Sequence, residues 1–300
     1  MSTLRVLRTA KTTLSRTFYL DEVATSATGV VTVTITREDG TVVQTGNATG
    51  PDANQVYTFT FNGSDILDRL PVSWALTVGG DALVLDQDVI EVVGGYYFGL
   101  SEARQIDTTF TNITRYPTAD VIEVRTQVEV ECENICRQAF VPRFERERLD
   151  GHPQQRHLRL RWPYIRKVRA VTVNGVAWDQ ARVDAIGPDR LGIIRPGTEW
   201  WWFWGGGFGS VWPWGIGNIV VEYEHGQDRP DPDIVRGSKL RWKSLMFERK
   251  SRSPLPDRSE RLQTSEIGVV SLASESQWST GIPSVDAAYS RHPSPRPGFG

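Results

Sequence analysis

Long hydrophobic runs and cysteine are scarce in this sequence, and both scarcities exclude classes of protein. No apolar run reaches the roughly 18 residues that span a bilayer, and the first residues, MSTLRVLRTAKTTLSRTF, lack the apolar stretch of a signal peptide. We therefore expect a soluble protein, made in the cytosol, with no membrane partner. Cys132 and Cys136 are the two cysteines. They lie one helical turn apart and are expected to be reduced core residues, since this spacing brings no further metal ligands.

Catalytic motifs are also lacking. The four histidines are scattered over predicted loops and the tail, without a helix-borne pair for a metal. The sequence holds no Gly-x-Ser-x-Gly elbow, and its GGGFG run lacks the Lys-Ser/Thr of a phosphate loop. Glu145, Glu147 and Asp150 have the chemistry of an acid–base pair, but they alternate with Arg146 and Arg148, as a solvated charge run does. We predict no enzyme activity, no catalytic residue, no metal and no cofactor.

The net charge of -2 hides an asymmetry between the two parts of the chain. Residues 1–95 hold 6 Lys+Arg against 11 Asp+Glu, which leaves 28 against 25 of the totals of 34 and 36 for the rest. Neither part has the strong basic excess of a sequence-specific nucleic-acid binder. The arginines between residues 143 and 169 alternate with apolar residues. Their exposed face either lines a DNA passage or is an ordinary solvated sheet surface. The candidates for facing a DNA lumen are Arg143, Arg146 and Arg148.

Residues 1–95 have the pattern of an immunoglobulin-like β-domain, with short alternating segments bounded by Gly, Asp, Asn or Pro. The clearest is GVVTVTITREDGTVVQTG, where Asp39-Gly40 is the expected hairpin turn. Alternation directs Val31, Val33 and Ile35 to one face. Residues 64–71, SDILDRLP, are expected to form a short helical turn.

One amphipathic helix is expected from about Thr118 to Gln138, where apolar residues recur at three- and four-residue steps. Pro142 ends this stretch, and a charged turn follows it. The helix presents one apolar stripe, which needs a partner to cover it. The predicted helix seam consists of Val121, Val124, Val128, Cys132 and Ile135.

The rest of the chain predicts an antiparallel sheet, a second helix and an arm. Residues of about 156–224 read as strands, with Asn174-Gly175 as a hairpin turn. Asp231-Pro232 starts a helix that ends near Lys250. The predicted class is α+β: an immunoglobulin-like β-sandwich (1–95), a small helical bundle with the β-insertion (96–252) and an extended C-terminal arm (253–300).

An aromatic run occupies the predicted hairpin tip before the last strand, in a glycine-rich setting. It consists of Trp200, Trp201, Trp202, Phe203 and Trp204, followed by Phe208, Trp212 and Trp214. A hairpin tip cannot bury this many indoles internally. A protein interface is the favoured explanation, because Trp is enriched at interfaces. Packing onto the neighbouring sheet and sugar binding are the alternatives.

Several segments together resemble a known protein family. They are the AFVPRFERERLDG that follows the helix, the VRAVTVNG strand, VVEYEHGQDRPDPDIVRGSKLRW, and STGIPSVDAAYSRH in the tail. Over residues of about 96–292 the chain resembles the head-to-tail adaptor, or head-completion, proteins of long-tailed bacteriophages, particularly those of actinobacterial hosts. Gly237 and Ser238 depart from the Ala-rich last helix of that family, so the packing of this helix is open.

The resemblance implies a structural virion protein of the neck, made in the host cytoplasm. Its copies would form a ring, of twelve subunits in the family's usual arrangement, between the portal and a head–tail stopper or tail-terminator protein. Genomic DNA would pass through its lumen without being read. The resemblance also implies that the arm contacts the portal or a neighbouring subunit, through Ile267, Val269, Val270, Trp278, Ile282, Val285 and Tyr289. The alternative function is a carbohydrate-binding or host-surface-binding phage protein that uses the Trp-rich hairpin.

Overall fold

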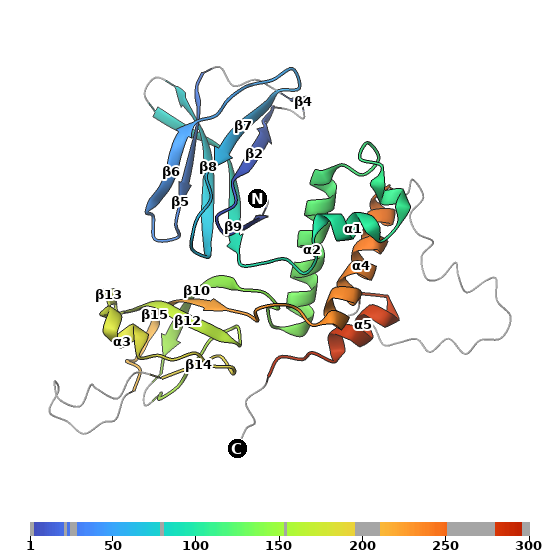
Figure 1. Ribbon diagram of the computed structural model, residues 1–300. Helices are drawn as coiled ribbons and strands as arrows, with labels where there is room; N and C mark the ends of the chain where they lie inside the picture. The colour runs from blue at the N-terminus through green and yellow to red at the C-terminus, as the bar shows by residue number, and fades with distance from the viewer. Residues whose placement is uncertain are drawn as a thin grey trace, which may run out of the picture. The chain divides into compact units, whose positions relative to one another are not determined.

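The computed structural model divides the chain into two compact units, each built from separate stretches of sequence. Unit 1 comprises Met1–Gly95 and Val141–Asp228, and unit 2 comprises Tyr96–Phe140 and Arg229–Gly300. Unit 1 holds the sheets and unit 2 the long helices, which confirms the predicted α+β class (Figure 1). The residues that the structure describes are 3–20, 23–24, 29–78, 81–152, 155–195, 211–250 and 280–295.

The first part of unit 1 is the β-sandwich that the sequence predicts. Its larger sheet has the order β1-β9-β8-β5-β6. The strands in that order are Thr3–Leu7, Asp81–Val93, Asp68–Val78, Val31–Thr36 and Val42–Asn47. β1 runs parallel to β9, whereas the other pairs of this sheet are antiparallel. The second layer pairs β2 (Thr12–Thr17) with β7 (Val56–Phe61), and β3 (Tyr19–Leu20) pairs with β4 (Val23–Ala24).

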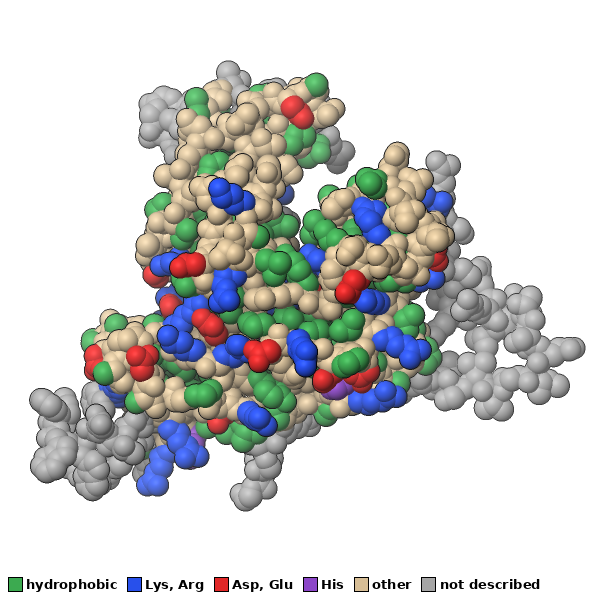
Figure 2. Space-filling model, in the orientation of Figure 1, with side chains coloured by type: hydrophobic (Ala, Val, Ile, Leu, Met, Phe, Trp, Pro, Cys, Tyr) green, Lys and Arg blue, Asp and Glu red, His purple; other side chains and the backbone are tan. Residues whose placement is uncertain are grey.

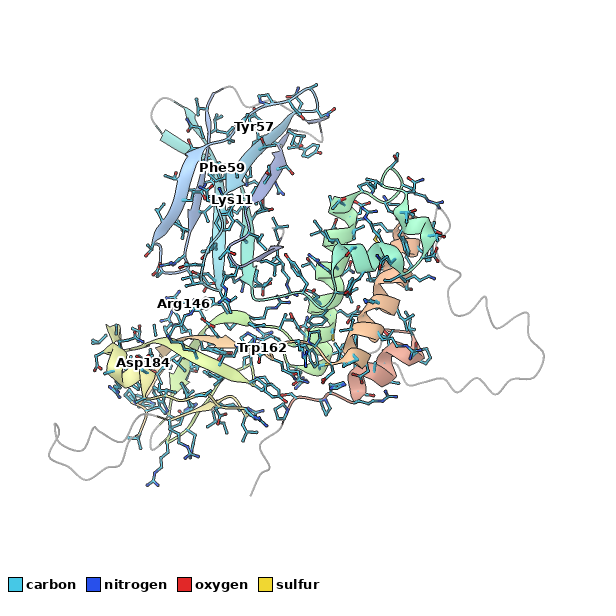
Figure 3. The ribbon with its side chains drawn as sticks, in the orientation of Figure 1. Lys11, Tyr57, Phe59, Arg146, Trp162 and Asp184 are labelled. Carbon is cyan, nitrogen blue, oxygen red and sulfur yellow. The ribbon has the colours of Figure 1, made fainter. Side chains whose placement is uncertain are left out.

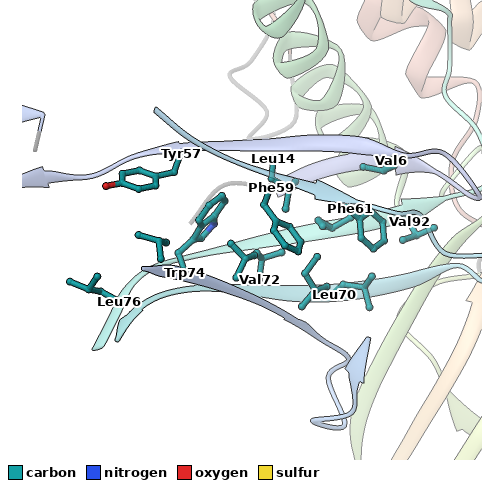
Figure 4. Packing of buried hydrophobic residues seen from close by; sticks show 14 residues of the cluster. Val6, Leu14, Tyr57, Phe59, Phe61, Leu70, Val72, Trp74, Leu76 and Val92 are labelled. Carbon is teal, nitrogen blue, oxygen red and sulfur yellow. The ribbon is translucent and has the colours of Figure 1, made fainter. Parts of the chain in front are cut away.

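Alternating side chains fill the space between these layers. In β5, the predicted inward residues Val31, Val33 and Ile35 are buried. Trp74 of β8 is fully buried, and Phe59 of β7 lies on the opposite side of the core (Figure 4). Successive residues of a strand face opposite sides, so a period of two produces this single apolar face.

The second sheet of unit 1 has the order β10-β15-β12-β13. These strands span Arg143–Gly151, Gly215–His225, Ile165–Val173 and Val176–Ala177. β11 (Leu158–Arg159) pairs with β14 (Ile193–Ile194), and α3 spans Gln180–Asp184. Asn174 and Gly175 have φ of 52° and 79° between β12 and β13. Two positive φ values in a two-residue turn match the twist of the strands, and the predicted hairpin is confirmed.

Two sequence predictions were wrong within unit 1. Residues 68–71 begin β8 instead of a helical turn, because Leu70 alternates with Val72 and Trp74 as the inward-facing residues of that strand. Residues 143–151 form strand β10 instead of a charged turn. Charged residues on both faces of β10 hide the alternation that a strand between core and solvent normally shows.

A buried group of charges connects β10 to the sandwich. The Arg5 Nε atom on β1 donates to the Glu91 carboxylate on β9 at 2.7 Å, and Arg143 Nε on β10 lies 3.8 Å from the same carboxylate. Arg5 and Arg143 are 5% and 2% exposed. Burial alone would raise the pKa of Glu91, but the two guanidinium charges lower it to about 2. His225 lies opposite Arg143 across the β10–β15 pair and is 3% exposed.

Unit 2 is a small helical bundle. Its elements are α1 (Leu100–Gln105), the 3-10 helix η1 (Thr108–Thr111), α2 (Thr118–Cys136), α4 (Pro232–Lys250) and α5 (Pro283–Ser290). α2 packs against α4, where the buried Trp242 donates its indole N–H to the Val121 carbonyl at 3.3 Å. Both cysteines are buried and free, as predicted. None of the helices in the described ranges is long and apolar enough to cross a membrane.

Residues 283–290 of the predicted arm are helical rather than extended. They form α5, whose Val285 and Tyr289 are buried. A Cβ atom at Gly237 of α4 would lie 3.1 Å from the Ala288 Cβ, so this glycine lets α5 approach closely. Ser238 Oγ lies 3.3 Å from the Tyr289 hydroxyl. Gly237 and Ser238, which depart from the family pattern, thus fit the packing of α5.

The neutral state of His225 makes unit 1 sensitive to acid. Burial, followed by the charge of Arg143, lowers the pKa of His225 to about 3 from an unfolded value of 6.5. The folded state therefore binds fewer protons between these values. This stabilisation is complete above pH 6.5 and is lost as the pH falls toward 3.

Replacing His225 with Phe should remove this dependence while keeping a ring against Trp162, which stacks on the imidazole at 5.2 Å. Between pH 7 and pH 5 the parent should lose about 2 kcal/mol more stability than H225F. Calorimetry of both proteins at the two pH values measures the difference, with the exposed His157→Phe as the control. Equal losses in the parent and H225F would contradict the assignment.

Tyr289 tests the packing of α5. Y289A should destabilise unit 2 by about 3 kcal/mol, because it empties a buried aromatic site. Y289F keeps the ring and loses the hydroxyl contacts, among them the one with Ser238, so it should cost about 1 kcal/mol. Denaturant unfolding followed by far-UV circular dichroism reports on the helices. Similar losses for the two variants would show that the ring adds little.

Candidate assembly surfaces

The predicted helix seam lies inside unit 2. Val121, Val124, Val128 and Cys132 are at most 2% exposed, and Ile135 is partly buried. α4 and α5 of the same chain pack against this helix. The stripe is therefore core, as the resemblance implies for the subunit bundle, and it is not an external docking surface.

The three arginines predicted to face a lumen have different environments. Arg143 is 2% exposed and belongs to the buried group around Glu91, so a lumen-facing role is inconsistent with its position. Arg146 lies on β10 (Figure 3), 3.1 Å from the Glu222 carboxylate, and donates to the Glu38 carbonyl at 3.1 Å. Arg148 is exposed and donates to the Gly217 carbonyl at 2.6 Å. Only Arg146 and Arg148 remain candidates.

Glu145 and Glu147 lie on the other face of β10 and are not the solvated charge run that the sequence predicts. Trp162 Nε1 donates to Glu145 at 3.1 Å, and the Arg161 backbone N–H donates to Glu147 at 2.8 Å. Burial raises the pKa of both carboxyls. Burial, followed by the charges of these two glutamates, also raises the pKa of Tyr223. Both glutamates therefore have a structural role, because they accept hydrogen bonds from the 158–165 segment and hold it in place.

Charge on the displayed surface is mixed. Lys and Arg side chains lie among Asp and Glu side chains on the face shown in Figure 2, without one large field of a single sign. On this face the mixture of charges agrees with the near-neutral sequence.

The aromatic run divides at its C-terminal end. Trp212 is 1% exposed and stacks on Trp178 with a centroid distance of 5.2 Å. Trp214 is 74% exposed, and Ile216, which follows on β15, is 89% exposed. Packing onto the sheet therefore accounts for Trp212, while Trp214 and Ile216, which flank Gly215 at the start of β15, are exposed apolar side chains and are here called the β15 apolar edge. Large exposed apolar side chains close together are a property of interaction sites.

An open cavity of about 490 Å³ borders this edge on the second sheet. Ile216, Gly217, Asn218, Asn174 and Arg148 are among its lining residues. The lining mixes the apolar side chains of Ile216 and Val220 with amides and charges of both signs. Among the described residues, no group of three or more His, Cys, Asp or Glu side chains is arranged to hold a metal ion.

Several predicted interface residues lie outside the described residues. They are Trp200, Trp201, Trp202, Phe203 and Trp204 at the hairpin tip, and Ile267, Val269, Val270 and Trp278 in the arm. Of the remaining arm residues, Val285 and Tyr289 are buried in unit 2 and Ile282 is partly buried. Sequence reasoning missed Ile216. Its position within GIGN gave a signal, because an apolar residue between two glycines has no apolar side chain next to it in the strand.

Comparison with known proteins yields structural similarities at low identity. No protein-family model and no curated protein matches the chain. It is similar to a chain of the neck of an empty gene transfer agent particle computed with C6 symmetry, at 14% identity and a TM-score of 0.42, over 68% of this chain and 93% of that chain. It is also similar to a chain of the virion of the native gene transfer agent particle, at 12% identity and a TM-score of 0.41, over 68% of this chain and 93% of that chain. A chain of the neck of the native particle computed with C12 symmetry matches at 13% identity and a TM-score of 0.34, over 63% of this chain and 94% of that chain. TM-scores this low carry no argument about function, so the function is inferred from the chain's own residues.

Proposed function

We propose that the protein is a structural component of the neck of a phage-like particle. Copies of it form a ring that joins the capsid portal to the tail, and DNA passes through the lumen without sequence-specific contacts. The finer parts of the proposal are twelve subunits, an actinobacteriophage type, contacts with a head–tail stopper or tail-terminator protein, and an immunoglobulin-like domain on the outside of the ring.

The observation that carries this proposal is where the resembling segments lie in the fold. AFVPRF contains the step from unit 2 to unit 1 between Phe140 and Val141, and QDRPDPDIV contains the return between Asp228 and Arg229. STGIPSVDAAYSRH contains the α5 helix, and Thr280 Oγ1, three residues before the helix begins at Pro283, donates to Asp286 at 2.7 Å. Three of the four resembling segments therefore lie at the junctions and closing elements of the fold, which are positions that a shared architecture would keep, while VRAVTVNG lies in β12 and the turn after it.

The β15 apolar edge supports assembly rather than chemistry. Protein interfaces are centred on large apolar and aromatic side chains, and Trp residues contribute strongly to their affinity. Trp214 and Ile216 have this character and are mostly exposed in the isolated chain. Arg146 and Arg148 are proposed to lie near the DNA path as non-specific contacts.

Electron microscopy of purified particles, with antibody labelling of this protein, tests the function directly. We expect label at the neck and ring-shaped class averages from the isolated protein. Absence from the neck would overturn the proposal. Glycan binding by a protein that stays monomeric would instead favour the carbohydrate-binding alternative.

Replacing Trp214 and Ile216 with Ser should weaken ring assembly about tenfold or more, because truncating a central interface aromatic typically costs about 2 kcal/mol. The thermal midpoint of the monomer should stay unchanged, since both side chains are mostly exposed. Analytical ultracentrifugation measures assembly. Ile113→Ser is the matched control, since this residue is 64% exposed but belongs to unit 2. Unaltered assembly of the double variant would show that the β15 apolar edge is not part of the interface.

A further inference from the structure

The α5 helix occupies a specific seat on α2 and α4. Gly237 leaves room for Ala288, and Ser238 faces the Tyr289 hydroxyl. The Cys136 thiol donates to the Tyr289 carbonyl at 3.5 Å. An eight-residue helix is too short to be stable alone in water. Its stability therefore comes from this seat.

The end of α5 is fastened by polar contacts. Gln138 Nε2 donates to the His292 carbonyl at 2.8 Å, and the His292 ring lies 2.8 Å from the Asp233 carboxylate at the start of α4. Phe140 meets the same ring edge-on at 5.9 Å. Shape and polar groups together make the seat selective for the sequence of α5.

The connection to α5 is much longer than this seat requires. The 13 residues from Gly237 to the end of α4 at Lys250 rise about 20 Å along the helix axis. About six extended residues cover that return distance. The connection, residues 251–279, has 29 residues. Its fully extended limit is about 100 Å.

That reach exceeds the spacing expected for two touching globular chains of this length. A compact 300-residue chain has a radius of gyration of about 19 Å, so equivalent points of two touching copies lie roughly 50 Å apart. The same residues form the seat in every copy. An α5 helix that moves to a neighbour's seat keeps all its contacts, which is the condition for exchange of an element between identical subunits.

We propose that each copy places its α5 helix in the α2–α4 seat of the next copy in the ring. This inference rests on the proposed ring function and adds a mechanism by which the ring is held closed. The partner is a second copy of this chain, and the interface is the seat around Gly237, Ser238 and Cys136. Assembly then converts an internal contact into one between subunits, without exposing new apolar surface.

Disulfide trapping distinguishes a neighbour's α5 from the chain's own. One chain carries Gly237→Cys and a second, tagged chain carries Ala288→Cys, both with Cys132→Ala and Cys136→Ala. A Cβ atom at residue 237 would lie 3.1 Å from the Ala288 Cβ, and this separation needs to open by only a few tenths of an ångström to suit a disulfide. We expect the mixed ring to give a two-chain band on non-reducing electrophoresis, and the cysteine-free background to give none. A ring in which a chain carrying both new cysteines is linked only to itself would overturn exchange but not the ring function. Absence of any ring would overturn both.

A length test avoids any strain at Gly237. Deleting residues 257–276 leaves nine connecting residues, enough for the chain's own seat but too few to reach roughly 50 Å. The deletion should keep the thermal midpoint of unit 2 and lose ring assembly. The matched control replaces residues 257–276 with a Gly/Ser sequence of equal length and should assemble. Assembly of both proteins, or failure of both, would overturn exchange.

Discussion

The buried contact between Arg143 and Glu91 is the constraint on which unit 1 depends. Arg143 opens β10 and Glu91 lies in β9, so the pair joins residues from the two sheets. Arg5 binds the same carboxylate. Removing Glu91 would leave two buried guanidinium groups without this carboxylate, which is far more costly than losing a surface ion pair. The contact thus specifies how the second sheet joins the sandwich.

Close backbone packing reinforces this junction. A Cβ atom at Gly94 would lie 2.6 Å from the Pro142 Cβ, and the Gly94 N–H donates to the Pro142 carbonyl at 3.0 Å. Gly94 directly follows β9 and Pro142 directly precedes β10. The chain therefore leaves unit 1 and re-enters it at neighbouring points, so residues 96–140 interrupt unit 1 in sequence but not in space.

Local patterns predicted the elements well, and long-range pairing was beyond them. The hairpins at Asp39-Gly40 and Asn174-Gly175 and the start of α4 at Pro232 follow from turn and cap chemistry that a few residues determine. Strand β10 was not predicted, because its charged residues pair with residues that are distant in sequence, such as Glu91 and Glu222. The site on which α5 packs was not predicted for the same reason, since the need for a glycine at residue 237 arises only from its contact with Ala288.

For the candidate surface, composition identified the Trp-rich region, but only the fold separated the buried Trp212 from the exposed Trp214.

The wide separation of α2 from its partners affects how the chain folds during synthesis. Cys136 meets the Tyr289 carbonyl across 153 positions of sequence. At about 5–20 residues per second, the ribosome needs roughly 8–30 s to make the intervening chain. α4, which also packs against α2, ends at Lys250 and is made before α5, so the valines of α2 gain their full cover only at the end of that interval, and apolar surface left exposed on a nascent chain favours aggregation. A chaperone therefore has most to contribute during the interval in which α2 waits for its partner helices, rather than to the final stability of the protein.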